Sequence, residues 1–197
     1  MMNLTVLIYL FYGVVSLGLG IYYTSWWFIA LAGYYLAIWF MEASIVRNIT
    51  RRQNRRTELE YRRMHKIGAA ILIMDAVLIV VVLLGIILGR TVKYPGIAIH
   101  ITAIYDIVIV ILAVYRLFHH MGDDSPVIVS SKCLNLTLAM TAILSLAAAG
   151  ATRFLGELIL RRIVIGVVGI AVCGLNYAIG RYLIRLADRD GAAKAAK

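Results

Sequence analysis

Six long apolar runs, separated by short polar stretches, organise this chain. They fall at 4–23, 25–46, 67–89, 94–118, 133–150 and 163–182. A helix needs about 20 mostly apolar residues to cross a bilayer, and these runs come close to that length. Only two prolines interrupt the chain, which favours long helices over loops. The pattern predicts an all-α integral membrane protein, in which 1–197 form a single domain with a six-transmembrane-helix bundle.

The first two runs are separated by a single residue, Thr24. Together they are roughly twice as long as one crossing requires. Tyr22, Tyr23, Trp26 and Trp27 cluster at the join, as aromatic residues do at a membrane interface. We expect a tight hairpin there, on the outer side of the membrane.

Composition indicates that lipid surrounds the bundle, and the distribution of charge indicates its orientation. The chain is 62% hydrophobic with a mean hydropathy of +0.88, so most of its surface requires lipid. Its net charge is +10, and eight of its twenty Lys and Arg residues lie in a basic loop at 47–66. With a cytoplasmic N-terminus, fifteen of these cations face the cytoplasm and five face outward. Because cytoplasmic loops are enriched in Lys and Arg, the sequence predicts a cell-membrane protein with both termini inside.

Helix-start signals lie outside two of the apolar runs. Thr57 and Glu60 form a capping box, and Ser125 followed by Pro126 is a second start signal. The third and fifth helices are therefore expected to extend on the cytoplasmic side. Residues 186–197 are expected to form a flexible C-terminal tail.

Two aspartates near the middle of apolar runs are the strongest functional lead. Asp75 and Asp106 lie near the expected midplane of a hydrocarbon core about 30 Å thick. An acid at that depth costs at least about 2.5 kcal/mol and usually faces a partner or a water-filled path. Their helices are expected to be antiparallel neighbours, which makes the two acids one candidate site.

Other polar residues extend this candidate site into an ion, proton or substrate path. The path residues are Asp75, Asp106, His100, Thr102, Glu42 and Asn176. A second interpretation is that the acids hold helices together, by bonding to backbone carbonyls or to Asn176, Asn135 or Thr137. His100 and Glu42 also have structural interpretations, as a hydrogen-bonded residue and as a residue reaching the inner interface.

The basic loop predicts contact with membrane lipids. Its candidate contacts with anionic headgroups are Arg51, Arg52, Arg55, Arg56, Arg62 and Arg63. Nucleic acid is not an expected partner, because the cations lie between membrane spans.

The first hairpin is rich in tyrosine, including Tyr9, Tyr12, Tyr34 and Tyr35. This composition suits packing and anchoring at the interface, and it also suits an aromatic-lined pocket for a cation or an apolar ligand.

Catalytic and cofactor-binding motifs give little support to an enzyme. The chain contains no GxSxG, HExxH or P-loop pattern, and no cofactor is expected. His119, His120, Asp123 and Asp124 are weak candidates for metal ligands. The same residues are suited to complementing one helix end and capping the next helix.

These observations leave two functional hypotheses. The first is a small membrane transport protein, either a channel or a proton- or cation-linked carrier that uses the midplane acids. The second is a non-transporting membrane adaptor or regulatory subunit that binds lipids or a partner protein through its basic cytoplasmic face. A homo-oligomer or a partner subunit fits either hypothesis.

Overall fold

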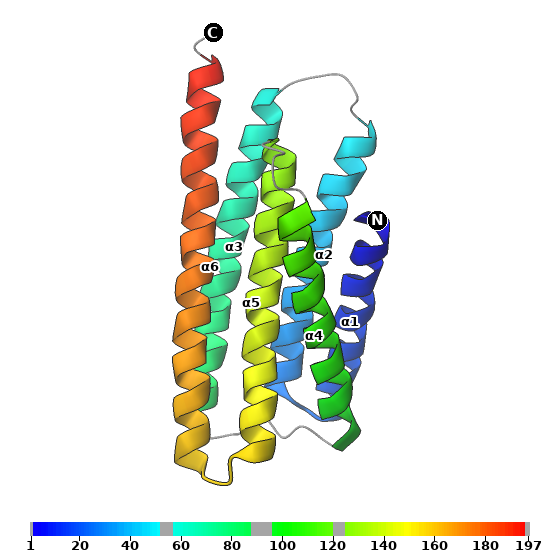
Figure 1. The fold of residues 1–197 in the computed structure, drawn as a ribbon, viewed down its shortest axis with the longest axis vertical. Helices are drawn as coiled ribbons and strands as arrows, with labels where there is room; N and C mark the ends of the chain where they lie inside the picture. Colours follow the sequence, from blue (N-terminus) through cyan, green and yellow to red (C-terminus); the bar gives the residue numbers. More distant parts are fainter. Residues whose placement is uncertain (1, 52–56, 88–95, 120–124, 196–197) are drawn as a thin grey trace.

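The computed structural model describes residues 2–51, 57–87, 96–119 and 125–195. Within these ranges the chain forms six helices and no strand, so the all-helical prediction is confirmed. The helices are α1 (Met2–Tyr22), α2 (Trp26–Arg51), α3 (Thr57–Ile87), α4 (Gly96–His119), α5 (Pro126–Phe154) and α6 (Leu158–Ala195). Successive helices run in opposite directions, and both termini lie toward the same end of the bundle (Figure 1).

Several helix ends follow the local signals in the sequence. Thr24 adopts a left-handed φ of 50° in the short turn between α1 and α2. The capping-box residue Thr57 is the first residue of α3. The hydroxyl of Ser125 caps α5 by accepting a bond of 3.4 Å from the backbone N–H of Ile128, with Pro126 in the first position.

The end of the chain differs from the prediction. The segment expected to form a flexible tail continues α6 as helix as far as Ala195. Its contacts explain the difference, because Leu186 and Ala187 pack in an apolar cluster with Tyr61 and Met64 of α3. The basic segment expected as a loop at 47–66 is also partly helical, since α2 continues to Arg51 and α3 begins at Thr57.

Apolar side chains dominate the outside of the bundle, which is compatible with a helical membrane protein. Within the described residues four helical segments are long and apolar enough to cross a membrane: Trp26–Ile45, Glu60–Ile87, Pro126–Phe154 and Leu158–Arg189. Shorter apolar stretches cover Val6–Tyr22 and Ile99–Tyr115 of α1 and α4. Large side chains such as Phe11, Ile73 and Ile170 are 70%, 67% and 76% exposed, as lipid-facing residues are.

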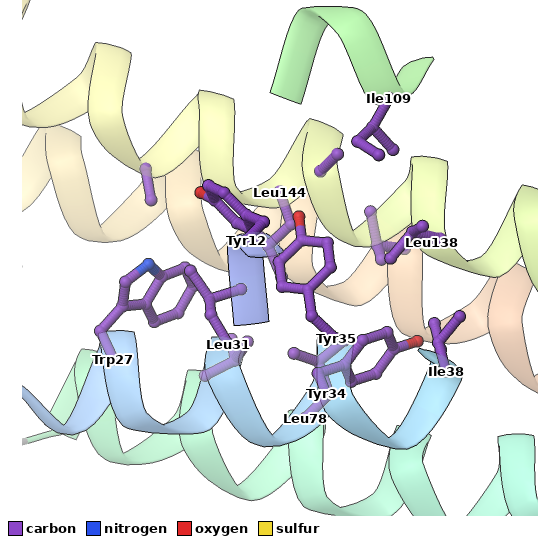
Figure 2. Packing of buried hydrophobic residues seen from close by; sticks show 14 of the residues in the cluster. Tyr12, Trp27, Leu31, Tyr34, Tyr35, Ile38, Leu78, Ile109, Leu138 and Leu144 are labelled. Atoms are coloured by element: carbon purple, nitrogen blue, oxygen red, sulfur yellow. The ribbon is translucent and has the colours of Figure 1, made fainter. Parts of the chain in front are cut away.

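Helix α5 lies at the centre of the bundle and packs against α2, α3, α4 and α6 (Figure 1). The other extensive contacts join α1 to α2, α3 to α6, and α2 to α3. The main apolar cluster includes residues of every helix, and Figure 2 shows part of it around Tyr12 and Tyr35.

The contact between α3 and α6 is a close backbone crossing. A Cβ on Gly68 would lie 3.0 Å from the carbonyl oxygen of Gly180, and one on Gly180 would lie 3.2 Å from that of Gly68. Small residues allow helices to approach in this way inside a membrane. The crossing holds α6 against α3 one helical turn beyond Asn176.

Candidate functional site

Polar side chains are buried between the helices, several of them along α5. At most 4% of each of the following residues is exposed: Ser16, Glu42, Asp75, Thr102, Asp106, Ser130, Asn135, Thr137, Thr141, Ser145 and Asn176. A lipid-exposed bundle must place such groups inside, where they find partners that lipid does not offer. The candidate site is therefore the bundle interior, and both predicted acids belong to it.

Asp106 is completely buried on α4. The hydroxyl of Tyr35 on α2 donates a hydrogen bond of 3.2 Å to its Oδ1 atom. Ser145 of α5 also lies near this carboxyl group. The Oδ2 atom makes no hydrogen bond of good geometry within the described part of the chain. One oxygen of the Asp106 carboxyl group is therefore buried without a hydrogen bond among the described residues.

Tyr35, which bonds this acid, belongs to a group of three contacting rings, and we refer to Tyr12, Tyr35 and Tyr105 as the tyrosine cluster. The rings of Tyr12 and Tyr105 are stacked, with centroids 3.5 Å apart. Tyr35 meets both rings edge-on, at centroid distances of 4.7 Å from Tyr12 and 5.9 Å from Tyr105. Since α1, α2 and α4 contribute one ring each, the cluster closes the space between three helices.

Asp75 of α3 has a different environment. It is 3% exposed and lies within hydrogen-bonding reach of Cys173 and Asn176 on α6. The side-chain amide of Asn176 donates to the hydroxyl of Tyr34 at 3.5 Å, and Tyr34 also interacts with Thr141 of α5. The Oδ1 atom of Asp75 lacks a hydrogen-bond partner among the described residues. Amide, thiol and hydroxyl groups therefore surround this acid.

The two acids do not form the single site expected from the sequence. Helices α3 and α4 are not among the pairs that pack extensively, because α5 lies between the α3–α6 pair and α4 (Figure 1). Consecutive residues of α2 contact the two acids separately. Tyr35 bonds Asp106, whereas Tyr34 is linked to Asp75 through Asn176. Figure 2 shows these two rings turned in different directions from α2. The prediction of one shared site is corrected to two sites.

Glu42 belongs to a third polar group, which connects α2 to α5 and α1. Its carboxylate is 1% exposed and accepts a hydrogen bond of 2.7 Å from the hydroxyl of Ser131. Asn135 donates to the backbone carbonyl of Ser131 at 2.8 Å, and the hydroxyl of Tyr9 donates to the Oδ1 atom of Asn135. The Glu42 side chain is therefore held inside the bundle rather than extending outward to the inner interface.

The two remaining candidates on α4, Thr102 and His100, differ in burial. Thr102 is 1% exposed and lies one helical turn before Asp106. His100 is exposed on the outside of the bundle. Six positions along a helix turn the side chain by about 240° at 3.6 residues per turn, so His100 and Asp106 face different directions. The structure therefore does not bring His100 together with Asp106.

The basic and metal candidates lie mostly beyond the described part. Arg62 is exposed and Arg63 is half-buried near the start of α3. Arg52, Arg55, Arg56, His120, Asp123 and Asp124 lie outside the described residues, as do the side chains of Arg51 and His119. Within the described residues, no group of three or more His, Cys, Asp or Glu side chains is placed to hold a metal ion.

Tyr105, Ser131 and Ser145 were not among the residues that the sequence singled out. Tyr105 directly precedes Asp106, but adjacent helix residues point in different directions, so adjacency alone is a weak signal. A better signal was the series Thr137, Thr141 and Ser145, which repeats every four residues and marks a polar face on α5.

Comparison of the chain with protein-family models, with curated proteins and with solved structures finds no match. The functional interpretation therefore rests on the chemistry of the interior itself.

Proposed function

We propose that this protein is a small transport protein of the cell membrane that moves protons or small cations, with Asp75 and Asp106 as the groups that receive them. In this proposal all six helices cross the membrane and both termini are cytoplasmic. The alternating helix directions are compatible with that topology. The distribution of Lys and Arg along the chain supports the orientation.

The observation that carries the proposal is the incomplete bonding of the two buried acids. Asp75 and Asp106 each have one carboxylate oxygen without a hydrogen bond among the described residues. An acid that only joined helices would gain from bonding both oxygens, since each unbonded buried polar group costs about 1–3 kcal/mol. An amide or hydroxyl would also join helices without placing a titratable group in lipid. A free carboxylate oxygen instead suits a group that receives a cation.

The polar face of α5 supports a route to the acids. Ser131, Asn135, Thr141 and Ser145 span about 21 Å of this helix at about 1.5 Å per residue. This series extends from the Glu42 group, through the level of Tyr34, to the Asp106 carboxyl group. A cation moving along it would meet oxygen atoms over a large part of the membrane thickness.

Flux through reconstituted vesicles tests the proposal. The purified protein is placed in liposomes that contain a pH-sensitive dye or a potassium-sensitive dye, and a gradient is then applied. We expect the wild-type protein to move protons or cations, and Asp75→Asn and Asp106→Asn each to reduce that flux about tenfold or more, a loss equivalent to about 1.4 kcal/mol. Asp188→Asn is the matched control, because Asp188 is an exposed acid that pairs with His65 at 3.7 Å.

Two results would contradict the proposed transport function. One is a wild-type protein without flux at any pH between 5 and 8 in intact vesicles. The other is flux that persists in the Asp75→Asn, Asp106→Asn double variant with its helical content unchanged by circular dichroism. Either result would favour the alternative, a non-transporting adaptor that uses its basic cytoplasmic face.

A further inference from the structure

We infer that Asp106 and the tyrosine cluster form a binding site for a small organic ammonium ion. This inference rests on the proposed function and adds to it the chemical class of the cation. The site lies between α1, α2 and α4, which contribute Tyr12, Tyr35 and Tyr105, with Ser145 of α5 beside the acid.

Charge and ring chemistry together define the ligand. A buried carboxylate attracts a cation, and the faces of aromatic rings attract organic cations, with a contribution of about 0.5–2 kcal/mol per contact. Tyr35 bonds only the Oδ1 atom of Asp106, so Oδ2 is left to meet an ammonium group. The methylene or methyl groups of such an ion would pack against the rings, whereas a hard metal ion requires oxygen ligands.

The same surroundings are poorly suited to a hard metal ion. Calcium takes about six to eight oxygen ligands and magnesium requires near-octahedral coordination. Tyr35 and Ser145 are the hydrogen-bonding neighbours that the structure assigns to the Asp106 carboxyl group. The ring of Tyr35, which bonds the acid, contacts the rings of Tyr12 and Tyr105, and the faces of such rings favour an ammonium ion.

The packing of the bundle provides a way in. Helix α1 packs extensively against α2, and α4 packs extensively against α5, but α1 and α4 are not an extensively packed pair. Tyrosine side chains bridge the two helices: Tyr12 stacks on Tyr105, and the hydroxyl of Tyr105 donates to the backbone carbonyl of Ile8 at 3.3 Å. An entering cation has to separate two rings and one long hydrogen bond rather than two packed backbones. Once apart, each ring offers a face to the ligand.

Equilibrium binding to the purified full-length protein tests this inference, with tetramethylammonium and methylammonium as probes. Isothermal titration in detergent measures affinity, and tyrosine fluorescence reports separation of the stacked rings. We expect saturable binding to the wild-type protein that Asp106→Asn weakens at least about tenfold, equivalent to about 1.4 kcal/mol. Tyr105→Leu is expected to weaken binding by a similar factor, whereas Tyr105→Phe, which keeps the ring, changes it less than about threefold.

Matched variants separate ring chemistry from folding. Tyr22→Leu removes a ring from an exposed edge-on pair with Tyr23, at a centroid distance of 4.8 Å, and is expected to leave binding unchanged. Tyr12→Leu repeats the ring test on another helix in case Tyr105→Leu fails to fold. Circular dichroism and gel filtration identify variants that retain the native fold.

The outcomes distinguish this inference from the transport proposal. Proton or potassium flux that depends on Asp106, together with no ammonium binding, would overturn the inference and leave transport standing. Binding that is equally strong in the leucine and phenylalanine variants would overturn the role of the rings. Ring-dependent ammonium binding without flux of any tested cation would support the ligand class while contradicting transport.

Discussion

Asp75 and Asp106 are the same residue type, buried to the same degree in one bundle, yet their surroundings differ in kind. Asp106 accepts a hydrogen bond from the hydroxyl of Tyr35, whose ring contacts those of Tyr12 and Tyr105. Asp75 faces an amide and a thiol on α6, with Tyr34 and Thr141 behind them. The difference arises on α2, where the consecutive side chains of Tyr34 and Tyr35 point toward different neighbours. Helix packing, rather than depth in the bundle, therefore decides what each acid contacts.

The two sides also differ in how their helices are joined. Beside Asp75, α3 and α6 cross at Gly68 and Gly180 with their backbones in close approach. Beside Asp106, α1 and α4 are bridged by tyrosine side chains. A backbone crossing fixes geometry, whereas a contact made by side chains can rearrange through rotamer changes. The Asp75 side is thus the more rigid of the two.

The largest effect is expected from Gly180→Leu, which should disrupt the contact between α3 and α6. A Cβ there already meets Leu72 at 2.8 Å, so a larger side chain must push α3 away from α6. Overpacking against a close backbone contact should cost about 3 kcal/mol, the upper end of the usual range. Chemical unfolding in detergent followed by circular dichroism measures the loss. Gly174→Leu on the same helix is the control, because nothing lies within 4 Å of its Cβ; equal losses in both variants would contradict the crossing.

A smaller effect is expected when each acid loses a neighbouring polar group. Asn176→Ala removes the amide that lies beside Asp75 and bonds Tyr34, and should destabilise the protein by about 2 kcal/mol. Ser145→Ala on the Asp106 side should cost about 1 kcal/mol, because the bond from Tyr35 remains. Thermal unfolding midpoints of the two variants, measured in one detergent, give the order. A larger loss for Ser145→Ala would reverse the comparison.

A still smaller difference in stability is expected between variants of the consecutive tyrosines, Tyr34 and Tyr35. Tyr35→Phe removes the donor to a fully buried carboxylate and is expected to cost about 1 kcal/mol. Tyr34→Phe removes the weak 3.5 Å bond from Asn176 and the contact with Thr141, neither of which involves a carboxylate directly, and should cost less. Unfolding by guanidinium chloride in the same micelles ranks the two variants. Equal costs would mean that the two sides depend on α2 to the same extent.

The smallest effect is expected for Cys173→Ala. A thiol is a weak hydrogen-bond donor, so Asp75 should lose less than about 1 kcal/mol of stabilisation while Asn176 remains beside it. Proteolysis of the native protein at increasing temperature is sensitive enough to compare this variant with the wild type. A loss as large as that of Asn176→Ala would make the thiol an equal partner of the acid.

The sequence predicted the helices well and their neighbours poorly. Local signals at Thr24, Thr57 and Ser125 located a turn and two helix starts, because capping and turn chemistry involve residues close in the chain. Hydropathy carries no information about which helices touch, so the pairing of α3 with α6 and the separation of the two acids by α5 were not predictable from it. The inward direction of Tyr105 and the outward direction of His100 depend on those contacts in the same way.

The polar face of α5 has a consequence for how the chain is made. Its serine, threonine and asparagine side chains are buried by α2, α3, α4 and α6 in the finished bundle. In the proposed topology α6 emerges after α5 during synthesis, so α5 enters the bilayer with part of that face uncovered. We expect the translocon or a membrane insertase to retain α5 until α6 arrives. Truncation of the chain before Leu158 should then leave α5 prone to slipping out of the membrane.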